Sequence, residues 1–181
     1  MPGRAHLSVQ RRPRRPESRR TRGVVLSSAV VLLLTGALAG CGGPVEIESH
    51  DLDDADRAAC EAFVGDLPET LADEERVDVE PDDALGAAYG DPAMVVTCGV
   101  PTPEGFDLTA QCQVANGVGW YIPNEVLDDP DADATLSAAG NRPVVEVFVP
   151  GDGDRGDRAA AAIAELAPLV EEHLPLVTRC D

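Results

Sequence analysis

The sequence of 181 residues predicts an α+β domain, in which an N-terminal and a C-terminal helix pack on one face of a mostly antiparallel sheet of four or five strands. Three observations lead to this fold class. Apolar residues recur at spacings of three and four in one segment near each end of the domain. Short runs rich in β-branched residues lie between these segments. Asn116-Gly117 separates two such runs and is the strongest hairpin signal in the chain.

The first 40 residues have the composition of a signal peptide. Residues 4–22 contain eight arginines and one acid, Glu17, whereas residues 24–40 are mainly apolar and small and carry no charge. This uncharged run is at the lower limit of the length that spans a bilayer. We therefore expect the segment to be removed rather than to stay inserted.

Leu38-Ala39-Gly40-Cys41 then matches a lipobox, in which a leucine and two small residues precede a cysteine. We expect cleavage before Cys41 and a diacylglyceryl thioether on its sulfur. The alternative is an ordinary cysteine behind a conventional cleavage site. Two acyl chains would hold the protein on the outer face of the cytoplasmic membrane. Arg19-Arg20 resembles a twin-arginine signal, but Arg22 and Gly23 stand where that signal prefers apolar residues, so we favour general secretion.

The mature chain is strongly acidic. Residues 1–40 hold eight of the 14 basic residues and one of the 33 acids, which leaves six bases, 32 acids and a formal charge of −26. A field of this sign repels the phosphates of nucleic acids and of anionic lipids, so neither is an expected partner. We favour a solvated acidic surface over a surface for divalent cations or basic peptides.

Cysteine usage agrees with export. Besides Cys41, the mature chain contains Cys60, Cys98, Cys112 and Cys180. An even number of cysteines in an oxidising compartment predicts two disulfides, for which three connectivities exist. No metal site is expected, because no pair has the Cys-x-x-Cys spacing and His50 and His173 lie far away in the sequence.

The mature chain is predicted to consist of a flexible tether at 41–53 and a single domain at 54–181. Its first half contains the tether and the first helix. Asp53 or Asp54 can cap a first helix, whose apolar stripe includes Cys60 and Phe63. Gly65 and Pro68 are expected to end it. Residues 72–92 are acidic and rich in turn residues, and we expect a surface loop with at most an edge strand at 76–80.

The second half supplies the strands and the last helix. We expect strands at 94–98, 111–115, 118–122, 134–138 and 144–149. With a two-residue turn at Asn116-Gly117, Cys112 pairs with Tyr121, and Trp120 points to the opposite face; a longer turn would reverse the faces. The last helix follows the glycines of 151–156 and is interrupted or kinked at Pro168.

The chain resembles the actinobacterial lipoproteins that carry the domain of unknown function 3515. The resemblance rests on Cys60 with Leu67-Pro68, Tyr89-Gly90-Asp91-Pro92-Ala93, Val95-Val96-Thr97-Cys98-Gly99-Val100-Pro101, Gly117-Val118-Gly119-Trp120, and Arg142-Pro143-Val144-Val145-Glu146-Val147-Phe148-Val149-Pro150. The chain departs from the family at Tyr89, where tryptophan is frequent, and at Gly119, where an acid is frequent. The resemblance implies a location and an architecture, but no chemistry.

The resemblance also implies a disulfide pairing. Members with only two cysteines keep the equivalents of Cys60 and Cys98, which implies that these two pair and that Cys112 pairs with Cys180. Sequence distance alone leaves a rival arrangement open, in which Cys98 pairs with Cys112 and Cys60 with Cys180.

Candidate functional residues are few. Trp120 and Arg142 are binding candidates if both are exposed on one face, although tryptophan is more often part of a core. Three groups of aspartates, at 51–56, 129–133 and 152–157, lack the glycine and glutamate of an EF-hand loop. Arg155-Gly156-Asp157 matches an adhesion tripeptide but overlaps a predicted helix start.

These observations predict a function class rather than a reaction. The mature chain has no lysine, and its serines and histidines lie outside nucleophile motifs. We expect no cofactor, no metal and no catalytic residue, and a lipid-anchored accessory or binding module of the cell envelope, with the membrane and an envelope protein as partners. The alternative is an envelope hydrolase that uses paired Asp or Glu carboxylates.

Overall fold

The computed structural model describes residues 43–180 except for 108, 111, 130 and 152. The predicted signal peptide and Cys41 lie outside the described residues. The helices are α1 (Asp54–Gly65), α2 (Asn124–Asp128) and α3 (Arg155–His173). The strands are β1 (Val45–Glu46), β2 (Thr70–Leu71), β3 (Glu74–Val77), β4 (Val79–Glu80), β5 (Gly86–Tyr89), β6 (Met94–Val100), β7 (Cys112–Ala115), β8 (Val118–Tyr121), β9 (Ala134–Ser137) and β10 (Val144–Val149).

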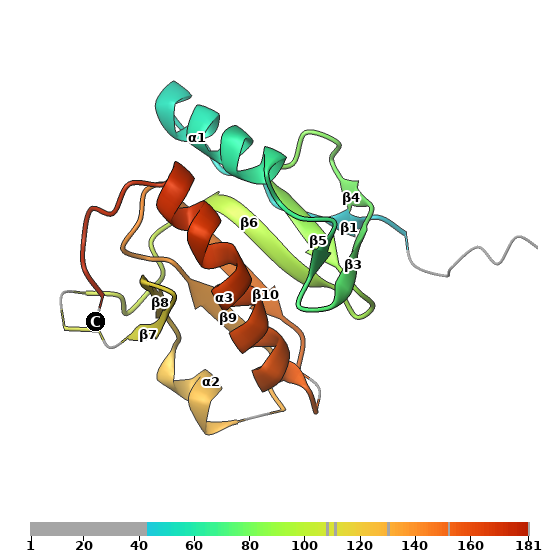
Figure 1. The fold of residues 1–181 in the computed structure, drawn as a ribbon, viewed down its shortest axis with the longest axis vertical. Coiled ribbons are helices and arrows are strands. Elements are labelled where there is room, and N and C mark those ends of the chain that lie inside the picture. Colours follow the sequence, from blue (N-terminus) through green and yellow to red (C-terminus); the bar gives the residue numbers. More distant parts are fainter. Residues whose placement is uncertain (1–42, 108, 111, 130, 152, 181) are drawn as a thin grey trace, which may run out of the picture. The chain divides into compact units, whose positions relative to one another are not determined.

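Eight of these strands form one antiparallel sheet in the order β2-β3-β5-β6-β10-β9-β8-β7 (Figure 1). The fold is α+β, as predicted, but the sheet is larger than the four or five strands expected. The additional strands β2, β3 and β5 come from residues 70–89, most of which were expected to be a surface loop. Strands β1 and β4 form a separate parallel pair.

Strand β5 was missed because its residues are small. All four residues of Gly86-Ala87-Ala88-Tyr89 are buried. Ala87 belongs to the core on the helix side, whereas Gly86 lies under Ile47, whose Cδ1 would be 3.1 Å from a Cβ at that glycine. Glycine and alanine have low β-propensity, but here they allow other chain segments to approach both faces of the strand.

The segment predicted as a flexible tether is partly fixed to the domain. Strand β1 pairs with β4 in the register Val45–Val79 and Glu46–Glu80, and Ile47 is buried. Asp53 then caps α1, because its carboxylate accepts hydrogen bonds from the backbone N–H groups of Ala55 and Asp56, at 2.9 Å each. This confirms the predicted start of the first helix.

Helices α1 and α3 both cover the sheet. Helix α1 contacts β6 and α3, and α3 contacts β10 as well as β7, β8, β9 and β2 (Figure 1). The buried stripe of α3 includes Ile163, Leu166 and Val170, and this packing holds the helix continuous through Pro168, where a break or kink was expected. Among the residues described, no helix combines the length and hydropathy needed to cross a membrane.

The hairpin formed by β7 and β8 has the predicted register. Cys112 lies opposite Tyr121 and Gln113 lies opposite Trp120. Asn116 and Gly117 form the turn with φ angles of 46° and 94°, the left-handed conformation that a two-residue hairpin turn requires. Trp120 consequently faces α3 and the core.

Candidate functional site

Trp120, a predicted binding candidate, lies in the core. Its side chain is 0% exposed and packs in the main hydrophobic cluster. The indole Nε1 has no hydrogen-bond partner among the described residues. Trp120 and Arg142 therefore do not form the exposed patch for which both were considered.

Arg142, the second binding candidate, is half-buried and organises a loop. Its Nη1 donates to the carbonyl oxygens of Ala139 and Asn141 at 2.9 and 2.7 Å, and its Nη2 donates to Oγ1 of Thr102 at 3.0 Å. Arg142 also lines a cavity of about 400 Å³, whose wall includes His50, Asp51 and Asp56. Its hydrogen bonds hold the connection between β9 and β10 beside residues 101–102.

The four cysteines after Cys41 form two disulfides. Cys60 of α1 pairs with Cys98 of β6, and Cys112 of β7 pairs with Cys180 after α3, with Cα–Cα distances of 5.5 and 5.4 Å. This is the pairing that the family resemblance implied, and the rival arrangement does not occur. The first bond fastens α1 to the centre of the sheet, and the second fastens the C-terminal tail to an edge strand.

Two aspartates of the acidic segment at 129–133 accept backbone hydrogen bonds. Asp129 accepts one from the N–H of Asp131 at 3.0 Å, within the same turn, and Asp133 accepts one from the N–H of Gly151 at 2.7 Å, in the loop before α3. Within the described ranges, no three His, Cys, Asp or Glu side chains gather closely enough to hold a metal ion. Asp129 and Asp133 therefore hold loop backbone in place.

The titratable groups with shifted pKa values lie on separate elements. Burial raises the pKa of Glu146, and a positive charge on His50 opposes this effect. Burial also raises the pKa of Tyr89, whose hydroxyl donates to the carbonyl of Pro68 at 2.9 Å. The pKa of Asp107 is lowered because Thr109 donates hydrogen bonds to its carboxylate. Acid–base sites gather such groups in one place, whereas these three lie on different elements and none of them lines the cavities that contain Arg142 or Arg155.

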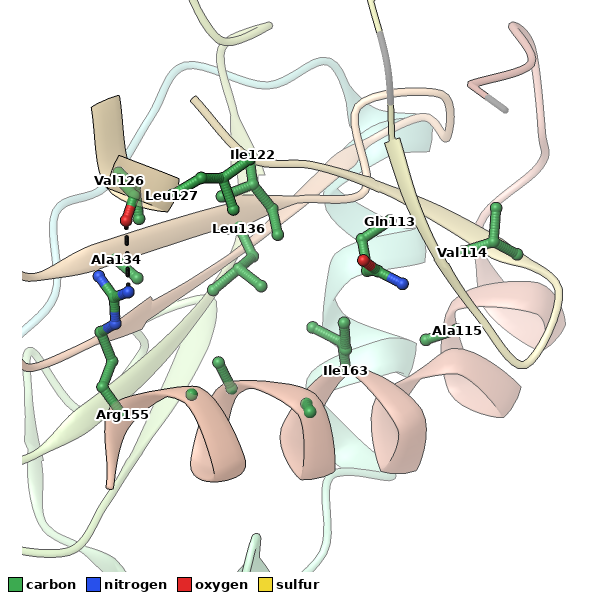
Figure 2. A pocket seen from close by; sticks show the side chains of 13 residues that line it. Gln113, Val114, Ala115, Ile122, Val126, Leu127, Ala134, Leu136, Arg155 and Ile163 are labelled. Atoms are coloured by element: carbon green, nitrogen blue, oxygen red, sulfur yellow. Dashed lines mark hydrogen bonds between the residues drawn. The ribbon is translucent and has the colours of Figure 1, made fainter. Parts of the chain in front are cut away.

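An open groove of about 490 Å³ lies between the β7–β8 hairpin, α2, β9 and the N-terminal half of α3 (Figure 2). Except for Gln113 and Arg155, the described residues that line it are apolar or glycine, and none of them is acidic. Two large apolar side chains at the groove are exposed, Val114 to 53% and Leu127 to 63%. We call this feature the apolar groove.

Arg155 closes one end of the apolar groove. It is the first residue of α3, and its side chain is only 9% exposed. Its Nη1 donates to the carbonyl oxygen of Ala132 at 2.7 Å, and its Nη2 donates to that of Val126 at 3.3 Å. These bonds connect α3 to α2 and place a guanidinium group at the end opposite Val114 (Figure 2).

Sequence reasoning found neither the groove nor the position of Arg155. The short helix α2 follows Pro123 and has no side-chain cap, so no motif indicates it. The walls come from segments almost 50 residues apart, and only the folded chain brings them together. Arg155 had been noticed only as part of a tripeptide at a helix start.

Comparison with known proteins assigns the chain to a family but indicates no reaction or ligand. No curated protein and no solved structure matches it. The sequence model of the family described as "Protein of unknown function (DUF3515)" matches residues 24–178, which include the whole sheet and all three helices. This match confirms the resemblance as far as the domain of unknown function 3515 is concerned, and the chain belongs to the DUF3515 family.

Proposed function

We propose that this protein is a lipid-anchored binding module on the outer face of the cytoplasmic membrane and that it acts without catalysing a reaction. The apolar groove is the observation that carries the binding role. Its volume of about 490 Å³ is within the range of ligand pockets, which are mostly apolar with a few placed polar groups. Exposed Leu127 and Val114 add apolar surface at its edge, a feature typical of interaction sites.

The location is supported by the beginning of the chain and by the cysteines. An arginine-rich start, an uncharged apolar run and Leu38-Ala39-Gly40-Cys41 together are typical of a lipoprotein signal. The pairs Cys60–Cys98 and Cys112–Cys180 suit an oxidising compartment.

A hydrolase with paired carboxylates is the second candidate function. One observation favours it: Asp51 and Asp56 share the wall of the smaller cavity with His50. Asp51 is exposed, however, and a general acid normally needs a buried carboxyl with a raised pKa. None of the described residues that line the apolar groove is acidic, so we favour binding.

Mass spectrometry of the protein purified from membranes tests the anchor. We expect a diacylglyceryl group on Cys41 and loss of membrane attachment in Cys41→Ala. An unmodified Cys41 in a protein that retains residues 1–40 would overturn the proposed location.

Photo-crosslinking in the membrane-attached protein tests the groove. A benzoylphenylalanine at Val114, whose exposed side chain lies at the edge of the groove, should form adducts with the bound molecule. The matched control is the same replacement at Ala58, which is exposed on α1 and outside the groove. Equal labelling at the two positions, or no adduct at Val114, would contradict the binding role of the groove.

A further inference from the structure

Arg155 is a buried cation that forms no ion pair with any acid whose side chain the structure describes. Only 9% of its surface is exposed, and both of its hydrogen bonds go to neutral carbonyl oxygens. Although the mature chain has 32 acids, no carboxylate among the described residues forms an ion pair with Arg155. Withdrawing a charge from water without a counter-ion costs free energy. An anion bound in the groove would recover part of this cost.

The surroundings of Arg155 have room and donors for such an anion. A guanidinium has five N–H donors, and the two hydrogen bonds of Arg155 use only two of them. A Cβ added at Gly156, which also lines the groove, would meet no atom within 4 Å. Both residues lie in the first turn of α3, where the helix dipole is positive. A carboxylate or phosphate suits this combination of donors.

The nearby acids do not remove this preference. Asp157 lies in the first turn of α3 and is exposed, so the high dielectric constant of the surrounding water weakens its interaction with Arg155. The guanidinium of Arg155 lies inside the groove wall, where the lower local dielectric strengthens its interactions. The net negative charge of the protein lowers the local concentration of anions, but it does not supply a partner for Arg155.

The remainder of the groove suits an alkyl chain. From Arg155 the wall continues along Ile122, Leu136 and Ile163 toward Val114 (Figure 2). We propose that the apolar groove binds an amphiphile with a single anionic head group on an alkyl chain, with Arg155 at the head group and the apolar wall around the chain. This inference rests on the proposed binding role of the groove. A fatty acid and a lipid phosphate share this chemistry.

Calorimetric titration of the mature chain with Cys41→Ala tests the inference without a competing lipid or detergent. The probes are decanoate, decyl phosphate and decanol, each below its micellar or solubility limit. A charge-assisted hydrogen bond contributes enough for decanoate or decyl phosphate to bind about tenfold or more tightly than decanol. The anion that binds with the higher affinity shows whether the head group of the ligand is a carboxylate, as in a fatty acid, or a phosphate, as in a lipid phosphate.

Two arginine variants separate the head-group contact from the chain contact. Arg155→Met should remove the preference for the anion and change decanol affinity by less than about twofold, because it removes the charge and keeps an apolar stem. Arg142→Met is the matched control, since Arg142 also donates to backbone carbonyls but lines the other cavity. It should leave all three affinities unchanged.

A third variant covers the possibility that Arg155→Met disturbs α2. Ala160→Trp fills the groove from an exposed position and should abolish binding of both anions and of decanol. Equal binding of anions and decanol to the parent would overturn the amphiphile inference and leave the groove as an apolar site. Unchanged anion binding in Arg155→Met or Ala160→Trp would overturn it as well. If no probe binds the parent, the inference fails, whereas crosslinking at Val114 still decides the proposed function.

Discussion

The disulfide between Cys60 and Cys98 is expected to supply much of the stability of this domain. It joins α1 to β6, and its two side chains are 0% and 2% exposed. The bond closes a loop with a sequence separation of 38 residues. The chain-entropy relation gives about 4 kcal/mol for a loop of this length. The free energy of unfolding of a domain of this size is about 5–15 kcal/mol. Replacing both cysteines by alanine should therefore remove a large fraction of that free energy.

The second disulfide provides the comparison. Cys112 and Cys180 are 68 residues apart, for which the same relation gives about 4.4 kcal/mol. We nevertheless expect the smaller loss here. The tail that carries Cys180 is held by few backbone bonds, such as those from Val177 and Thr178 to Gly140. Once the disulfide is removed, this tail can detach locally, which limits the loss in the rest of the domain.

Urea unfolding of the mature chain measures both losses. Fluorescence of the single, buried Trp120 reports the core, and far-ultraviolet circular dichroism reports the helices. For a slope near 2 kcal/mol/M, a loss of 4 kcal/mol lowers the midpoint by about 2 M. A loss below about 1 kcal/mol for the Cys60–Cys98 pair would refute its assigned role. A larger loss for the Cys112–Cys180 pair would refute the argument from local detachment.

Three further substitutions test the cap, the core and a buried carboxyl by the same measurement. Asp53→Ala removes the cap of α1 and should lower stability by about 1 kcal/mol, and Asp53→Asn should restore most of it. Leu166→Ala opens a void beneath α3 and should cost about 2–5 kcal/mol; a loss under 1 kcal/mol would contradict its full burial. Glu146→Gln should stabilise the domain at neutral pH, because burial raises the pKa of this carboxyl above 4.5 and its ionisation in the folded state is unfavourable. Since the acid is neutral in both states at low pH, the advantage should shrink as the pH falls from neutral through the raised pKa and should be lost below 4.5, and a constant advantage would contradict the raised pKa.

Elements with strong local signals were predictable from the sequence. The first helix follows from the cap at Asp53 and from Cys60 and Phe63 at helical spacing, all of which the structure confirms. The hairpin register follows from Asn116-Gly117, because a two-residue turn leaves one pairing of the adjoining strands. In both cases residues within one element determine its geometry.

Elements that depend on distant partners were not predictable. Strand β5 consists of glycine, alanine and one tyrosine, and it is a strand because β3 and β6 pair with it on either side. Strand β1 is ordered by β4, more than 30 residues away. The apolar groove depends equally on tertiary packing, since its wall combines α2, β9 and α3, and the hydrogen bond from Arg155 to the carbonyl of Val126 joins α3 to α2 only in the folded chain.

The pairing of β1 with β4 limits how far the domain can reach from the bilayer. Val45 is four residues after Cys41, and an extended chain of that length spans at most about 14 Å. If Cys41 carries the acyl chains that we propose, the domain stays within one protein diameter of the lipid headgroups. Its encounters are then confined to a thin layer, where outer-leaflet amphiphiles and the extracytoplasmic parts of membrane proteins are abundant. A molecule in this layer can reach the domain by lateral diffusion alone.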